Sequence, residues 1–266
     1  MQASVCNSFF MEAIVNDITL HYERIGPRSS DGPVLLFLHE ALGSIAQWKD
    51  FPSELCERLQ LPGIVYERQG HGASTPLDQK RDAQYLHNYA LNELPAFFNT
   101  IQEERLIVLV GHSDGGTIAL LFASAHPERI AGIVTMAAHV INEPETIAGI
   151  APAVAAYHAG KLDGLKKYHG DKTESLFYAW ADIWRSEAFT HWDITREISN
   201  SSAAGLFIQG ADDQYGTEKQ LDLISQNYSG EHEIALLDNC GHHPHLEAKE
   251  AVIAHIEKWW SNSLEL

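Results

Sequence analysis

Short apolar runs alternate along the chain with segments in which apolar residues recur at helical spacing. The runs are rich in β-branched residues and have the length of strands that are buried on both faces. Strands that alternate with helices build βαβ units, which predicts an α/β fold with a mostly parallel sheet and helices on both faces. The predicted strands span residues 34–39, 64–67, 107–110, 130–136, 205–209 and 233–237.

The first apolar segment has a different pattern. Two β-rich runs within residues 13–25 flank the dipeptide Asn16-Asp17. Two strand-like runs about such a dipeptide are typical of a hairpin. We therefore expect an antiparallel hairpin at the edge of the sheet.

The alternation of strands and helices stops after Ala138 and returns near residue 201. The stretch between them contains helical patterns at 147–159 and 173–185 and many aromatic residues. Longer crossover helices would also fit, but the length and the aromatic content favour a lid over an active site. We predict a first core part at 1–138, a helical cap at 139–200 and a second core part at 201–266.

Composition restricts the partners. The 266 residues carry a formal net charge of −18, which argues against nucleic acid and anionic membranes as partners. Three widely separated cysteines without a C-x-x-C pair indicate neither a disulfide framework nor a thiolate zinc site. No apolar run approaches a membrane span, and the first residues lack a signal-peptide pattern. We expect a cytoplasmic protein; its oligomeric state is left open, a homodimer included.

The strand pattern at 107–110 leads into Gly111-His-Ser-Asp-Gly115, and a helical pattern follows directly. So tight a turn brings the backbone close to itself at positions 111 and 115, where both residues are glycine. G-x-S-x-G between a strand and a helix is the nucleophile elbow, which raises the serine hydroxyl above the sheet. It also places the first N–H groups of the helix beside that hydroxyl. Ser113 is therefore the candidate nucleophile.

A serine becomes a good nucleophile when a neutral histidine removes its proton and a carboxylate orients that histidine. Asp212 and Asp213 follow the predicted strand 205–209, and His242 follows the strand 233–237. Such groups collect at the carboxyl ends of the strands of an open α/β sheet. We therefore expect His242 and one of the two aspartates to lie close to Ser113.

With these motifs in the order serine, aspartate, histidine, the sequence resembles the α/β-hydrolase superfamily over nearly its whole length. It is most similar to the small capped members: meta-cleavage-product hydrolases, non-haem haloperoxidases and small esterases. The matching stretches are HEALGS at 39–44, GHGAS at 70–74, GHSDG at 111–115, GADD at 210–213 and GHHPHLE at 241–247.

The resemblance implies a mostly parallel eight-stranded sheet with a helical cap insertion. It implies Ser113 as nucleophile, His242 as general base and then acid, and Asp213 as the residue that orients His242. The family's G-x-x-D spacing, counted from Gly210, favours Asp213 over its rival Asp212, which we expect to be a turn or cap residue. The substrate expected from this resemblance is a small molecule.

The oxyanion donors implied by the resemblance are the backbone N–H groups of Ala41 and Asp114. Where the family commonly has glycine after the histidine of the first motif, this chain has Glu40. An inward carboxylate would oppose the oxyanion, so we expect Glu40 to point away as a solvated loop residue. The carboxylate of Asp114 could attract a cationic substrate such as an amino-acid ester, or be a solvated or hydrogen-bonded loop residue.

The residues around the predicted base include His243, His245 and Glu247, but their spacing is not H-E-x-x-H. We expect no metal and no cofactor, with His245 and Glu247 in the first turn of the C-terminal helix. The leading hypothesis is a cofactor-free serine hydrolase of a small ester, lactone, amide or carbon–carbon bond. The alternatives are a perhydrolase or haloperoxidase-like enzyme with the same triad, and a non-catalytic small-ligand receptor on the same fold.

Overall fold

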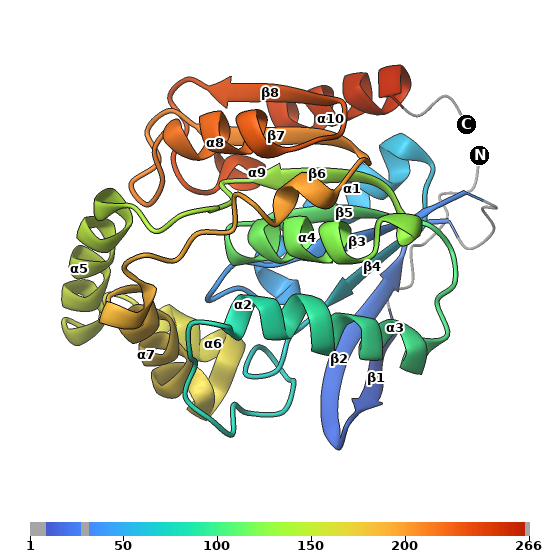
Figure 1. The fold of residues 1–266 in the computed structure, drawn as a ribbon. Helices are drawn as coiled ribbons and strands as arrows, with labels where there is room; N and C mark the ends of the chain where they lie inside the picture. The colour runs from blue at the N-terminus through green and yellow to red at the C-terminus, as the bar shows by residue number, and fades with distance from the viewer. Residues whose placement is uncertain (1–8, 28–31, 264–266) are drawn as a thin grey trace.

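The computed structural model describes residues 9–27 and 32–263, and in these ranges eight strands form one sheet (Figure 1). Their spatial order is β1-β2-β4-β3-β5-β6-β7-β8. The pairs from β4 to β8 are parallel, whereas β1 and β2 pair antiparallel with each other and β2 pairs antiparallel with β4. The strands are β1 Phe9–Val15, β2 Ile18–Ile25, β3 Val34–Leu38, β4 Gly63–Tyr66, β5 Ile107–His112, β6 Ile130–Met136, β7 Ala204–Gly210 and β8 His232–Leu237. The predicted fold class is confirmed.

The edge hairpin is present where the sequence predicts it. Asn16 and Asp17 connect β1 to β2 with φ angles of 49° and 66°. Positive φ at both central residues is the requirement of a type I′ turn, whose twist matches that of two paired strands.

Helices cover both faces of the sheet, as the buried strands require (Figure 1). Alternate residues of β5 point to opposite faces. The helices outside the cap are α1 Phe51–Leu59, α2 Tyr85–Asn88, α3 Leu94–Ile101, α4 Asp114–Ala125, α8 Lys219–Asn227, α9 Pro244–Glu247 and α10 Lys249–Ser263. Ile107 and Leu109 pack in a core with α3, α4 and α8, whereas Val108 and Val110 pack in a core with α1 and α10. A π-helical turn, Tyr89–Glu93, joins α2 to α3.

The chain between β6 and β7 is helical, as predicted for the cap. It contains α5 Pro144–His158, α6 Lys166–His169 and α7 Thr173–Trp184, which gather beside one end of the sheet on the left of Figure 1. Aromatic rings hold these helices together: Tyr157 of α5 stacks on Phe177 of α7 with ring centroids 4.1 Å apart. The domain boundaries at 139 and 200 stay a prediction.

A lysine of the cap binds the core. Lys172 donates from Nζ to the carbonyl oxygens of His71, Gly72 and Ser74, in the glycine-rich turn after β4. Three carbonyl acceptors replace the water that the partly buried ammonium group gives up. Within the described part of the chain, no helix combines the length and the apolar character that crossing a membrane requires.

Candidate active site

Ser113 lies at the turn between β5 and α4 with φ of 53° and ψ of −119°, a strained conformation for a residue with a Cβ. The neighbouring glycines make the turn sterically feasible. A Cβ on Gly111 would lie 2.4 Å from the carbonyl oxygen of Gly115, and a Cβ on Gly115 would lie 1.9 Å from that of Leu38. The predicted elbow is therefore present at the carboxyl edge of the sheet.

Three loops bring the predicted catalytic residues together. Nε2 of His242 lies 2.9 Å from the Oγ of Ser113. Nδ1 of His242 lies 2.9 and 2.8 Å from the two carboxylate oxygens of Asp213. The side chains of Asp213 and His242 are 0% and 5% exposed, so water competes little for these contacts. Asp212, the rival acid, is exposed and takes no part in this arrangement.

Asp213 is held in place by three further donors. Gln209 Nε2 donates to Oδ2 at 2.6 Å, and the N–H groups of Tyr215 and Gly216 donate to Oδ1 at 2.8 and 3.3 Å. Burial raises the pKa of Asp213, but His242 and the Tyr215 N–H outweigh burial, and the pKa lies below its usual range. Asp213 is therefore an oriented carboxylate.

The imidazole of His242 is fixed on several sides. Because Nδ1 faces a carboxylate, Nδ1 carries the proton, and the lone pair of Nε2 faces the serine hydroxyl. The ring of Tyr215 contacts the imidazole edge-on with centroids 4.8 Å apart. The backbone of His242 is also held, since His112 Nε2 donates to its carbonyl oxygen at 2.6 Å. The ring has the tautomer and the orientation of a general base.

The loop after β3 is held by Arg68, a fully buried residue that follows β4. Its Nη1 donates to the carbonyl oxygen of His39 at 2.6 Å, and its Nη2 donates to that of Glu40 at 2.8 Å. In a trans peptide the C=O and N–H groups point in opposite directions. The Ala41 N–H therefore points away from Arg68, and Ala41 lines the cavity that contains Ser113.

Asp114 supplies the first N–H of α4, which has no acceptor inside the helix. Across residues 9–27 and 32–263, neither this N–H nor that of Ala41 has a hydrogen-bond acceptor. Both residues line the same cavity as Ser113. Two backbone donors are thus available to an anion beside the hydroxyl, although the oxyanion role itself stays a prediction.

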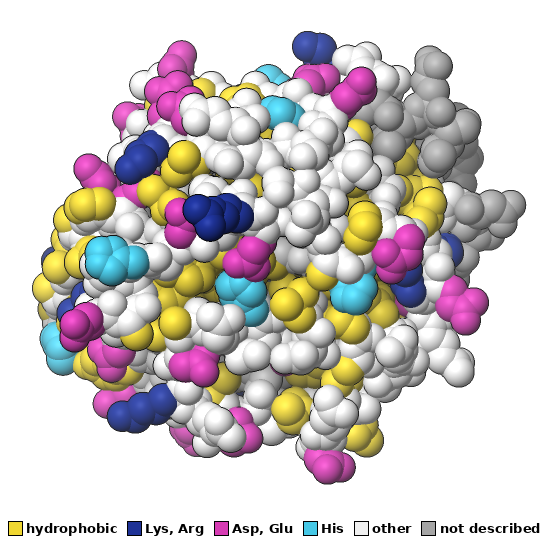
Figure 2. Space-filling view, in the orientation of Figure 1, with side chains coloured by type: hydrophobic (Ala, Val, Ile, Leu, Met, Phe, Trp, Pro, Cys, Tyr) yellow, Lys and Arg dark blue, Asp and Glu magenta, His cyan; other side chains and the backbone are white. Residues whose placement is uncertain are grey.

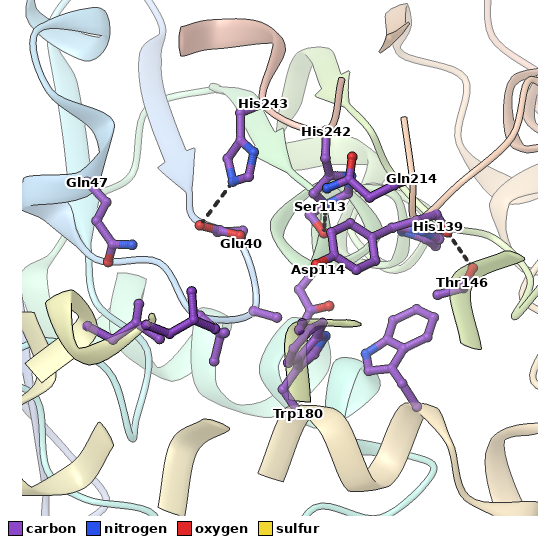
Figure 3. A pocket seen from close by; sticks show the side chains of 17 residues that line it. Glu40, Gln47, Ser113, Asp114, His139, Thr146, Trp180, Gln214, His242 and His243 are labelled. Carbon is purple, nitrogen blue, oxygen red and sulfur yellow. Dashed lines mark hydrogen bonds and ion pairs between the residues drawn. The ribbon is translucent and has the colours of Figure 1, made fainter. Parts of the chain in front are cut away.

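A cavity of about 260 Å³ lies over Ser113 (Figure 3). The core supplies Ser113, His242 and Tyr215 to its lining, and the cap supplies Trp180 and Trp184 among other residues. A concave, largely apolar site with a few polar groups is the usual form of a small-molecule site. The cap therefore closes the space in front of the nucleophile.

The orientation predicted for Glu40 is wrong. Its side chain is 21% exposed and lines the cavity rather than pointing into solvent, and its Oε1 lies 3.6 Å from Nε2 of His243 (Figure 3). Burial raises the pKa of Glu40, but the polar contact with His243 and the charge of that histidine outweigh it and keep the pKa well below its usual range. Burial lowers the pKa of His243, but Glu40 outweighs it and the pKa is raised. The inward carboxylate is stabilised by this histidine.

Asp114 is buried and hydrogen-bonded rather than solvated. Its Oδ2 accepts from the Tyr85 hydroxyl at 2.9 Å, and the Trp184 Nε1 donates to the same hydroxyl at 2.7 Å. The residue after the nucleophile is thus linked through Tyr85 to the cap helix α7.

The histidines near His242 pack against one another. The rings of His112 and His245 lie 4.6 Å apart, and burial lowers the pKa of His245 to about 3. The placement of His245 and Glu247 in the C-terminal helix is wrong, because they lie in the separate helix α9. Glu247 accepts from the Gly241 N–H at 2.7 Å and closes this loop on itself. The described residues contain no group of three or more His, Cys, Asp or Glu arranged to hold a metal ion.

Relatives match the chain over part or most of its length. Protein phosphatase methylesterase 1 of Bos taurus is 31% identical over 105 residues, which is 39% of this chain and 27% of the methylesterase. The match thus spans about a quarter of that relative. The 2-succinyl-6-hydroxy-2,4-cyclohexadiene-1-carboxylate synthase of Enterobacter sp. (strain 638) is 24% identical over 245 residues, covering 84% of this chain and 89% of the synthase.

The fold is shared with solved structures. The 2-hydroxy-6-oxo-6-phenylhexa-2,4-dienoate hydrolase of Rhodococcus sp. strain RHA1 superimposes with a TM-score of 0.75. It has 16% sequence identity, and the match covers 96% of this chain and 100% of that one. A sequence profile described as the alpha/beta hydrolase family matches residues 35–255, from β3 into α10. The chain therefore belongs to the alpha/beta hydrolase family.

Proposed function

We propose that this protein is a cofactor-free serine hydrolase that cleaves a small ester, lactone, amide or carbon–carbon bond, most readily an ester. The observation that carries the proposal is the continuous set of contacts from the Ser113 hydroxyl through His242 to Asp213. The esterase name of one relative, quoted above, also supports acyl chemistry.

For an ester, the reaction begins when the Ser113 Oγ attacks the acyl carbon and His242 Nε2 takes the hydroxyl proton. The carbonyl oxygen becomes an oxyanion, which the N–H groups of Ala41 and Asp114 stabilise. His242 then gives its proton to the leaving alcohol, and an acyl-serine remains. Water, deprotonated by His242, attacks this acyl group; the carboxylic acid leaves, and the Ser113 oxygen takes the proton back from His242. Asp213 holds the imidazole and stabilises its cationic form in both halves.

The substrate class follows from the size and the enclosure of the cavity. About 260 Å³ accommodates a small acyl group, and residues 139–200 act as a cap domain over it. We propose a small-molecule substrate, no nucleic-acid or membrane partner, and a cytoplasmic location. A homodimer is compatible with this proposal.

Labelling with a fluorophosphonate probe tests the nucleophile. The wild type is expected to form a covalent adduct, and Ser113→Ala to form none. Ser261→Ala is the matched control, because Ser261 lies on the exposed face of α10, where its hydroxyl bonds only to the Glu257 carbonyl. Labelling of folded Ser113→Ala, or an unlabelled wild type, would contradict the proposal.

A panel of p-nitrophenyl esters of increasing chain length then measures turnover. Short acyl chains are expected to give the highest kcat/KM, because the cavity is small. Peroxide-dependent bromination as fast as ester hydrolysis would favour the perhydrolase alternative. Tight binding of one compound without turnover of any ester would favour the receptor.

A further inference from the structure

The charges that line the cavity are unbalanced. Two residues with carboxylates, Glu40 and Asp114, line it, and so does His243, whose pKa is raised by its contact with Glu40. No Lys or Arg of the described residues lines it. An anionic acyl group would find no cation except a histidine that Glu40 already occupies.

The position of Glu40 next to Ala41 makes its carboxylate unusual. The Ala41 N–H is a proposed oxyanion donor, so a negative side chain one residue away opposes the charge that develops in the reaction. His243 contacts Glu40 through Oε1 at 3.6 Å. Within residues 9–27 and 32–263, Oε2 of Glu40 has no hydrogen-bond partner. Glu40 thus keeps an oxygen available to a second cation.

Other residues that line the cavity also suit a cation. Asp114 uses one carboxylate oxygen for Tyr85, and the described residues provide no hydrogen bond to its other oxygen, Oδ1. The cap adds Trp180 and Trp184, and the core adds Tyr215. Aromatic faces beside carboxylates attract ammonium groups through the ring quadrupole. Figure 3 shows Glu40, Asp114 and Trp180 around the space in front of Ser113.

We propose that the substrate carries an ammonium group on the carbon next to the scissile acyl carbon, as in an α-amino-acid ester, and that Glu40 binds this group. The inference rests on the proposed function and names the substrate class of the same site. Glu40 and Ala41, the proposed oxyanion donor, are neighbours in the chain. In the substrate, the ammonium that Glu40 would bind and the carbonyl that Ala41 would bind are likewise on neighbouring carbons.

The bound ammonium also removes the electrostatic conflict. An ammonium bound between Glu40 and the reacting carbonyl screens the oxyanion from the charge of the Glu40 carboxylate. An uncharged substrate would leave this repulsion in place in the transition state. The surface is consistent with a cationic substrate: on the face in Figure 2, Asp and Glu side chains are spread widely and Lys and Arg are fewer.

Two isosteric p-nitrophenyl esters test the proposal. The L-alanine and isobutyrate esters differ by an ammonium in place of a methyl group. At about pH 6.5, below the ~7.7 that is usual for an α-amino group, the amine is largely protonated. We expect wild type to prefer the alanine ester in kcat/KM by roughly tenfold or more, the usual effect of a charged hydrogen bond.

Glu40→Gln keeps the side-chain volume and removes the charge. It should lower kcat/KM for the alanine ester by roughly tenfold and raise that for isobutyrate, because the side chain no longer repels the oxyanion. Glu187→Gln is the control with the same change in net charge, because Glu187 is exposed and outside the cavity. Inhibition constants of 1-aminoethylboronic acid and isopropylboronic acid, which form tetrahedral serine adducts, give the same comparison without a leaving group.

The outcomes separate this inference from the proposed function. If Ser113 reacts with a fluorophosphonate but the enzyme shows no preference for the ammonium compound in either assay, the inference alone is wrong. A preference that persists unchanged in Glu40→Gln overturns the role of Glu40. Failure of Ser113 to react with the fluorophosphonate or the boronic acids overturns the proposed function, and the inference with it.

Discussion

His169, the last residue of α6, lies with its Nε2 2.9 Å from the carbonyl oxygen of Leu42. Its Nδ1 accepts from the Gly72 N–H at 3.0 Å, so the proton is on Nε2 and this nitrogen donates to Leu42. Burial lowers the pKa of His169 and favours the neutral form that makes both contacts. One cap residue therefore joins the loop of the proposed oxyanion hole to the glycine-rich turn.

We expect His169→Leu to lower kcat by about tenfold with little change in KM, because the loop that carries the proposed oxyanion donor loses its contact with the cap. His169→Gln should recover much of the activity, since its amide can donate to Leu42 and accept from Gly72. His158→Leu, at an exposed position of α5, is the control. Equal losses of kcat in the Leu and Gln variants would contradict a positioning role.

Arg68 is a second positioning residue, because its guanidinium holds the carbonyl groups of His39 and Glu40. Arg68→Met leaves the buried carbonyl of His39 without a donor, whereas that of Glu40 keeps the donor His39 Nδ1 at 2.7 Å. The lost hydrogen bonds should lower the free energy of unfolding by roughly 1–3 kcal/mol. Thermal unfolding measures this loss, and the rate of fluorophosphonate labelling measures the disturbance of the loop. The free energy of unfolding of Arg68→Lys should lie between those of wild type and Arg68→Met, since lysine has a charge but lacks the planar guanidinium that donates to two carbonyls. A stable Arg68→Met variant would refute this account.

Much of the fold and of the candidate site is predictable because its signals are local. Buried strands are apolar runs. The turn at Ser113 needs glycine at positions 111 and 115, because a Cβ there would collide with the backbone of Gly115 or of Leu38 in β3. The carboxyl ends of β7 and β8 then place Asp213 and His242 at the same edge of the sheet. Chain order and sheet geometry were sufficient for these placements.

The orientation of Glu40 was not predictable in this way, because its partner His243 is distant in sequence and its backbone is held by Arg68. The environment of Asp114 depends on Tyr85 and on Trp184 of the cap. One signal was available for Arg68: a charged residue within two positions of the end of a buried strand indicates a group that needs internal partners.

The choice between the two neighbouring aspartates gives a matched pair of variants. Asp213→Asn should lower kcat by roughly 10³–10⁴-fold, because the amide no longer holds the imidazole in the required tautomer. Asp212→Asn changes the adjacent, exposed carboxylate and should leave kcat nearly unchanged. Ester hydrolysis by both variants, with circular dichroism to verify folding, measures the difference. A large loss in Asp212→Asn with normal activity in Asp213→Asn would reverse the assignment.

The ion pair of Glu40 and His243 should make the free energy of unfolding depend on pH, with a loss of stability at both low and high pH. His243 has a raised pKa, so its contribution is fully present below the ordinary value of 6.5 and is lost as pH rises through the folded-state pKa. Glu40 has a lowered pKa, so its contribution is present above the ordinary value of 4.5 and is lost as pH falls through its folded-state pKa. The pair therefore stabilises the fold most between these two ordinary values.

Urea unfolding of the wild type and of His243→Gln at several pH values tests this window. The difference in free energy of unfolding between them should be largest at about pH 5–6, between the ordinary pKa values of Glu and His, and should shrink at high pH. His191→Gln, an exposed substitution on the cap side of β7, serves as the control and should show no such dependence. A difference that grows as pH rises would mean that the neutral form of His243 stabilises the fold, and the ion pair would then not account for the inward orientation of Glu40.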